Sequence, residues 1–236
     1  MIRYRDLESI LFQNHVLIAG ATGSGKSVLE NDLLYHCLFY TPDQVSLALI
    51  DPKRIELYRY KKLPHVIGYE TEPNKAVNLL KHCENIMMQR YDIMQRYNSL
   101  KWTGNQLFIF IDEWAPLTLV SDKKLKKAIE DTVQNIAQLG RAAGVHLVLC
   151  TQYIITLNTR IRCNFDNRIA LRCACVADSK KLIDVSGAEL LPRYGEMLYS
   201  SAAGLKHLKV PFIDQNTIQT GIDHWTPKPK KRTRPF

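Results

Sequence analysis

The sequence has no long hydrophobic run. No stretch of its 236 residues approaches the roughly 18 to 20 consecutive apolar residues that a membrane-spanning helix needs. The first ten residues, MIRYRDLESI, carry charges where a secretory signal peptide would have its apolar core. We therefore expect a cytoplasmic protein that has no membrane span of its own and reaches a membrane only through a partner.

Paired cysteines are also missing. The six cysteines form no C-x-x-C pair, and the seven histidines show no metal-ligand spacing. His82 beside Cys83, or Cys173 together with Cys175, leaves zinc binding as an alternative, but ordinary packing of these side chains is favoured. The sequence thus argues against a disulfide framework and indicates a reducing compartment.

Acidic residues are fewer than basic ones. The chain has 23 Asp and Glu against 32 Lys and Arg, which gives a net charge of +9. Five of these nine charges lie in the last ten residues, PKPKKRTRPF, which contain no acid. We predict a folded domain over residues 1–214 and a basic, disordered tail over residues 215–236. The positive charge favours a polyanionic partner, with a merely solvated tail as the alternative.

Four short apolar runs predict the strands of a buried sheet. They are apolar at nearly every position and span residues 15–19, 45–50, 107–111 and 145–150. Strands covered by helices on both faces have this composition, as in a parallel sheet. Amphipathic helices are expected over residues 71–97 and 124–143, and the pattern after Gln152 predicts a further strand, a short helix and a hairpin. The fold class is therefore α/β, with a mostly parallel central sheet flanked by helices.

The first strand runs directly into a glycine-rich loop and then a helical pattern. Residues 20–27, GATGSGKS, fit the phosphate-binding pattern G-x-x-x-x-G-K-[ST] in the strand, loop and helix context that it requires. In such a loop backbone N–H groups wrap the phosphates of ATP, Lys26 neutralises the β/γ charge and Ser27 binds Mg²⁺. The glycine spacing G-x-x-G-x-G argues against a dinucleotide site. The predicted nucleotide contacts are Gly20, Ala21, Thr22, Gly23, Ser24, Gly25, Lys26, Ser27 and Val28.

Polar residues at the ends of two later strands predict the rest of the site. Asp112 is placed to hold Mg²⁺ and Glu113 to polarise the attacking water, with two solvated acids as the alternative. Gln152 is predicted to sense the γ-phosphate or to act as an ordinary hydrogen-bonding group at a strand end. Arg141 is predicted to be an arginine finger across a subunit boundary or a cation at the end of a helix.

Together these motifs resemble the motor core of the FtsK/SpoIIIE DNA translocases, within the HerA/FtsK branch of P-loop ATPases. The resemblance covers about residues 14–200 and includes HVLIAGATGSGKSV, LIDPKRIEL, FIDEWAPL and QLGRAAGVHLVLCTQ. It implies a RecA-like domain, ATP and Mg²⁺ as cofactors, and a homo-oligomeric, hexameric ring with double-stranded DNA in its channel. It also implies the phosphate, metal, water, sensor and finger roles given above for Lys26, Ser27, Asp112, Glu113, Gln152 and Arg141. Basic side chains that follow DNA phosphates do not read bases, so DNA binding should be sequence-tolerant.

The sequence departs from the family pattern after Gln152. The family usually continues with Arg-Pro, whereas Tyr-Ile-Ile follows here, which leaves Arg160 and Arg162 open as DNA contacts. The membrane helices and the winged-helix DNA reader of the large division proteins have no counterpart in this sequence. Such minimal cores resemble motors of plasmids, integrative elements and viruses.

The resemblance is compatible with several functions. We favour DNA transfer by a mobile element, with a relaxase or a membrane-anchor protein as a further partner. Viral genome packaging and protein secretion are the alternatives within the superfamily, and chromosome segregation and a nucleotide-gated binding protein are further alternatives. The intact set of Lys26, Asp112 and Glu113 argues against a protein that only binds nucleotide.

The stretch IDPKRIELYRY raises a separate question. An apolar strand ends at Asp51 and is followed at once by Lys53, Arg54 and Glu56. These charges either face water after the strand or lie at the edge of the nucleotide site. The family resemblance favours the second interpretation, and we expect the three side chains to face a neighbouring subunit rather than DNA.

Overall fold

An eight-stranded mixed sheet organises the chain. The computed structural model of the protein describes residues 10–192, 194–210 and 212–226, and the strand order within them is β3-β2-β4-β5-β1-β6-β7-β8. The first six strands in this order are parallel, and β7 and β8 add an antiparallel edge. The strands are β1 (Val16–Ala19), β2 (Val45–Ile50), β3 (Val66–Glu70), β4 (Gln106–Ile111), β5 (Val145–Thr151), β6 (Asn167–Leu171), β7 (Glu196–Ser201) and β8 (Gly204–Lys209).

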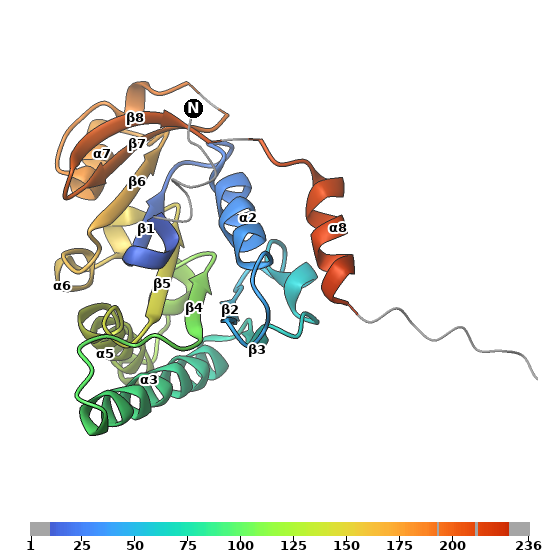
Figure 1. Cartoon of the computed structure of the whole chain (residues 1–236). Coiled ribbons are helices and arrows are strands. Elements are labelled where there is room, and N and C mark those ends of the chain that lie inside the picture. The colour runs from blue at the N-terminus through green and yellow to red at the C-terminus, as the bar shows by residue number, and fades with distance from the viewer. Residues whose placement is uncertain (1–9, 193, 211, 227–236) are drawn as a thin grey trace, which may run out of the picture.

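Helices cover both faces of the sheet (Figure 1). Alternate side chains of β1 show the two layers: Leu17 packs with α3 (Pro73–Arg96) and α5 (Lys123–Leu139), and Ile18 packs with α2 (Lys26–Cys37). Burial on both faces explains why the central strands are apolar at nearly every position. The chain also forms helices α4 (Ala115–Thr118), α6 (Thr159–Arg162), α7 (Val176–Ile183) and α8 (Gln215–Trp225).

The predicted fold class is confirmed, and the four predicted apolar strands are β1, β2, β4 and β5. Strand β3 was not predicted. It lies at the edge of the sheet, and its side chains are exposed or only half-buried, so its sequence VIGYE lacks a continuous apolar run. Helix α5 ends at Leu139, four residues earlier than predicted, and residues 140–144 form a turn before β5.

Helix α8 corrects the predicted boundary at residue 214. Asp214 caps this helix by accepting hydrogen bonds from two backbone N–H groups of its first turn. Ile218 and Ile222 are buried against the layer of α2, and the indole N–H of Trp225 donates to the carbonyl of Leu38 at 2.9 Å. The expectation of disorder is therefore wrong for residues 215–225. The basic stretch 227–236 lies outside the described residues.

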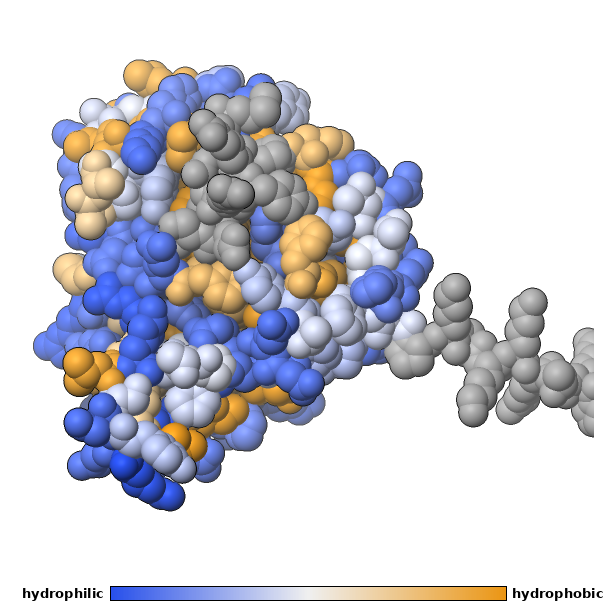
Figure 2. Space-filling view, in the orientation of Figure 1, coloured by the Kyte–Doolittle hydropathy of each residue, from blue (hydrophilic) through white to orange (hydrophobic). Residues whose placement is uncertain are grey.

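The surface is mostly hydrophilic on the face that Figure 2 shows, with hydrophobic side chains scattered in small groups. Within the described ranges no helix combines the length and the hydropathy that a membrane crossing requires. All six cysteines are free thiols.

Candidate nucleotide-binding site

Three strand ends bring the predicted site residues together. β4, β5 and β1 are neighbours in the sheet, where Ala19 pairs with Thr151 and Ile111 pairs with Leu149. Because these strands are parallel, the residues that follow them emerge at one edge of the sheet. The glycine-rich loop after β1, the two acids after β4 and Gln152 after β5 therefore meet there.

The glycine-rich loop has a backbone that only glycine adopts easily. Gly23 and Gly25 have φ angles of 76° and 101°, in the left-handed region. A Cβ atom on Gly25 would also lie 3.0 Å from the backbone nitrogen of Gly195, which donates a hydrogen bond to the carbonyl of Ser24. Helix α2 begins at Lys26, so the free N–H groups and the positive end of its dipole are available to an anion at the loop.

Lys26 joins the loop to the strand-end acids. Its Nζ atom donates to the carbonyl and to Oδ1 of Asp112, both at 2.8 Å. Burial lowers the pKa of Lys26, but neighbouring Cys150, Glu30 and Asp112 outweigh this effect and raise the pKa above its usual range. Burial also raises the pKa of Glu30 well above its usual range; Lys26 opposes that shift and the Asp112 carboxylate adds to it. A buried, charged ammonium thus lies where the phosphate loop meets β4.

Glu113 is held by three donors from two segments. Its carboxylate is 1 % exposed and accepts hydrogen bonds from the Thr151 hydroxyl at 2.8 Å and from the Gln152 backbone N–H at 3.0 Å. The Lys53 ammonium forms an ion pair with it at 3.1 Å. The neighbouring side chain of Gln152 accepts a hydrogen bond from the hydroxyl of Thr22 at 3.1 Å. Residues after β2, β4 and β5 are thus linked to one another and to the phosphate loop.

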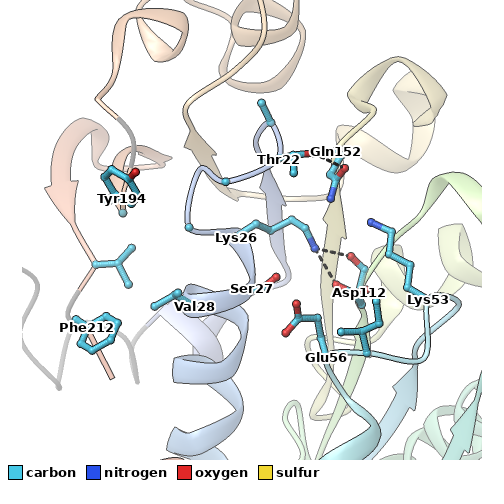
Figure 3. A pocket seen from close by; sticks show the side chains of 16 residues that line it. Thr22, Lys26, Ser27, Val28, Lys53, Glu56, Asp112, Gln152, Tyr194 and Phe212 are labelled. Carbon is cyan, nitrogen blue, oxygen red and sulfur yellow. Dashed lines mark hydrogen bonds and ion pairs between the residues drawn. The ribbon is translucent and has the colours of Figure 1, made fainter. Parts of the chain in front are cut away.

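A pocket of about 560 Å³ opens at this junction (Figure 3). Its size falls in the range of sites for small molecules and cofactors. Lys26, Asp112 and Gln152 lie toward one end, and Tyr194 and Phe212 lie at the other. Of the predicted nucleotide contacts, Ala21, Thr22, Gly23, Gly25, Lys26, Ser27 and Val28 line the pocket. Gly20 and Ser24 do not line it, and a Cβ on Gly20 would meet the Ser24 side chain.

The oxygen atoms at the pocket suit Mg²⁺. Ser27, Glu56 and Asp112 line it, and Oδ2 of Asp112 is buried without a hydrogen-bond partner. Among the described residues no group of three or more His, Cys, Asp or Glu side chains is arranged to hold a metal ion. Mg²⁺ typically takes only one or two protein carboxylates and completes its shell with phosphates and water, so these residues fit that ion.

Arg141 lies away from this pocket. It is in the turn before β5, whereas the pocket is beyond the other end of that strand. Its guanidinium forms an ion pair with Asp166 and a hydrogen bond to the Asn14 side chain, both at 2.7 Å. Within one chain, Arg141 is therefore not brought to the nucleotide.

The charges after β2 have separate partners. Lys53 pairs with Glu113, Arg54 lies 3.5 Å from Glu72, and Glu56 accepts a hydrogen bond of 3.4 Å from Asn31. Each of the three side chains thus has a partner in its own chain, and the expectation that they face a neighbouring subunit stays a prediction. The link from Lys53 to Glu113 was missed in the sequence, since 60 residues separate the two.

Tyr194 and Phe212 were missed as well. Both side chains line the pocket, and each is 82 % exposed. Tyr194 precedes β7 and Phe212 follows β8, and neither segment contains a sequence motif for nucleotide binding. Only the pairing of those strands next to β6 brings them beside the phosphate loop.

The sequence is similar to those of known DNA translocases. The chain is 36% identical over 230 residues to the DNA translocase FtsK of Chlorobaculum tepidum, which covers 86% of this chain and 28% of that protein. It is 32% identical over 235 residues to the DNA translocase SpoIIIE of Bacillus subtilis, with coverage of 89% and 29%. The chain thus spans under a third of the length of these two relatives.

Solved structures agree on the fold. The conjugation coupling protein TcpA, determined with ATPγS, superposes with a TM-score of 0.78 at 23% identity and covers 90% of this chain and 65% of its own. The cytoplasmic domain of the type VII secretion ATPase EccC of Thermomonospora curvata has a TM-score of 0.74 at 22% identity and covers 92% and 28%. The model of the FtsK/SpoIIIE family matches residues 2–106 and 99–156. By this match and by its identity to the two translocases, the chain belongs to the FtsK/SpoIIIE family.

Proposed function

We propose that this protein hydrolyses ATP to move double-stranded DNA. The observation that carries the proposal is that Lys26 and Asp112 line one pocket beyond the ends of β1 and β4, while the buried Glu113 is held beside it by Lys53 and Gln152, which also line the pocket. That arrangement provides a cation for the phosphates, an oxygen for Mg²⁺ and a carboxylate for the attacking water. Relatives in the same family are described as DNA translocases, which supports DNA as the substrate of the motor.

The roles of the residues follow from their contacts. ATP would replace the Asp112 side chain as a partner of Lys26, because the loop N–H groups and the ammonium both attract phosphate. Ser27 and Asp112 would hold Mg²⁺, which neutralises charge on the β- and γ-phosphates when bound. Glu113 would orient and deprotonate water, and its donors fix the carboxylate for that step. Gln152, which contacts the loop through Thr22, would report the state of the γ-phosphate.

The assembly that fits these roles is a homo-oligomeric ring, which we propose to be hexameric. Arg141 lies beyond the opposite end of β5 from the pocket of its own chain, so it reaches a nucleotide only in a neighbouring subunit. DNA in the channel would be held through its phosphates, in line with the net charge of +9 and without base recognition. Arg162 is paired with Asp184 at 2.9 Å and would need to leave that partner to contact DNA.

For the biological setting we propose DNA transfer by a plasmid or another mobile element. This setting predicts a relaxase gene beside the gene of this protein. A neighbouring capsid gene would assign the motor to genome packaging instead, and a secretion operon would assign it to protein export.

The ATPase rate with and without long duplex DNA tests the proposal. The expected result is hydrolysis that duplex DNA stimulates and that high salt reduces, because phosphate contacts weaken as salt concentration rises. Lys26→Ala serves as the inactive control. Hydrolysis without any stimulation by DNA would contradict the translocase function, and stimulation by a secreted polypeptide would favour protein export.

A further inference from the structure

The end of the pocket away from Lys26 is apolar and aromatic. Val28, Tyr194 and Phe212 lie at that end (Figure 3). Val210, whose backbone is hydrogen-bonded to Gly195 next to Tyr194, also lines the pocket, and none of these side chains is charged. Tyr194 and Phe212 are 82 % exposed, although large aromatic side chains are usually buried. An exposed aromatic pair that faces a cavity offers ring surfaces to a flat, apolar ligand.

Tyr194, Val210 and Phe212 form an aromatic wall of the pocket. Backbone hydrogen bonds fix the position of this wall relative to the phosphate loop. The N–H of Gly195 donates to the carbonyl of Ser24 at 3.2 Å, and the carbonyl of Gly195 accepts from the N–H of Val210 at 2.8 Å. Tyr194 has a φ angle of 78°, which few non-glycine residues adopt. The backbone is therefore strained at the residue whose ring faces the pocket. The aromatic wall and the phosphate loop are thus parts of one cavity.

We propose that Tyr194 and Phe212 bind the base of the nucleotide by stacking, and that they make this site favour purine over pyrimidine nucleoside triphosphates. The inference rests on the proposed use of ATP at the phosphate loop. With the phosphates at Lys26 and the start of α2, the other end of the same cavity is where the base of that nucleotide would lie. Val28 and Val210 add aliphatic surface there.

The residues of this wall also determine which nucleotide bases the site favours. Ring faces and aliphatic groups hold any flat base in proportion to its contact area and do not read its edges by hydrogen bonds. ATP and GTP therefore bind with similar affinity, while CTP and UTP, which have smaller bases, bind more weakly.

Calorimetric titration of the full-length protein with Mg²⁺ and either ATPγS or inorganic tripolyphosphate tests this proposal. Tyr194→Ala and Phe212→Ala should each raise the Kd for ATPγS roughly tenfold, the effect typical of losing one aromatic stacking partner. The Kd for tripolyphosphate should stay within about twofold of the wild-type value, because the phosphate loop is intact. Tyr194→Phe should keep wild-type affinity, since its ring remains, and the double variant should lose the preference of ATP over CTP.

Tyr97→Ala is the matched control, because Tyr97 is 81 % exposed and lies at the end of α3. Both target side chains are largely exposed, so their removal should leave the fold intact. An unchanged Kd for ATPγS in both alanine variants would overturn the base site while leaving the phosphate site in place. Equal weakening of ATPγS and tripolyphosphate, or a change in oligomeric state alone, would also overturn it. A wild-type protein that binds neither ligand would contradict the proposed function itself.

Discussion

The Nζ atom of Lys53 lies 3.1 Å from Oε2 of Glu113, so the motif after β2 contacts the acid after β4. The two strands are parallel neighbours in the sheet, and their last residues, Ile50 and Ile111, pair with each other. The segments that follow them therefore begin at the same edge of the sheet. The Glu113 carboxylate is buried, whereas Lys53 is 35 % exposed and lines the pocket. Lys53 is thus a positioning residue for Glu113, the proposed general base of ATP hydrolysis.

Lys53→Met should lower kcat for ATP roughly tenfold and leave KM within about threefold. The reason is that Glu113 would lose one of its three donors, and small displacements of a catalytic group cost large factors in rate. Steady-state ATPase measurements provide both constants. Arg54→Met is the matched control, because this neighbouring cation is exposed and pairs with Glu72. A raised KM with unchanged kcat would instead make Lys53 a nucleotide contact.

Glu113→Gln should bind ATP and hydrolyse it at least about a hundredfold more slowly than the wild type, because an amide does not accept the proton of water. The amide oxygen can still accept the hydrogen bonds of Thr151 and Gln152, so the fold should be unchanged. Nucleotide binding and product formation are measured on the same preparation. Glu72→Gln, on the exposed surface, is the control. Rapid turnover by Glu113→Gln would remove Glu113 from its proposed role.

Lys26→Ala and Arg141→Ala should each be inactive alone and should regain part of the activity when mixed. In a mixed ring, an intact Lys26 on one subunit meets an intact Arg141 on the next, and an arginine finger contributes about 10³- to 10⁵-fold in rate. Subunit exchange is confirmed first with labelled protein. If well-mixed rings stay inactive, Arg141 is not an arginine finger, and its contact with Asp166 belongs to its own chain alone.

The free energy of unfolding should fall as the pH drops below about 6.5, because two buried histidines are neutral in the folded state. Burial is the main cause that lowers the pKa of His15 to about 4 and that of His146 to about 3. The charge of Arg141 lowers the pKa of His15 further, and Asp166 opposes that shift. The pKa of His146 is lowered further by His15, Arg90 and Lys101. The unfolded chain takes up these protons near pH 6.5, so each histidine costs about 2 kcal/mol at pH 5 relative to pH 8.

A substitution at His15 isolates the contribution of this residue to the pH dependence of stability. The Nδ1 atom of His15 accepts the backbone N–H of Leu147 at 2.9 Å, and the amide oxygen in His15→Asn can take over that hydrogen bond without titrating. Urea unfolding at pH 8 and pH 5 should therefore show a smaller loss of stability in His15→Asn than in the wild type. Identical losses in the two proteins would show that His15 does not contribute to the pH dependence.

Much of the fold was predictable because its signals are local. A strand buried on both faces must be apolar along its length, and this pattern located β1, β2, β4 and β5. The phosphate loop was predictable for a similar reason, since its conformation requires glycine at particular positions. Edge strand β3 and helix α8 were missed, because a half-exposed strand and a short amphipathic helix carry weak patterns.

The sequence alone determined the four apolar strands β1, β2, β4 and β5, the phosphate loop at Lys26 and the type of group that follows these strands. Those features depend on residues close together in the chain. Tertiary structure decided that Lys53 meets Glu113, that Arg141 lies beyond the far end of β5, and that Tyr194 and Phe212 line the pocket. The physical reason is that these relationships follow from strand order and register, which join segments that no local pattern connects.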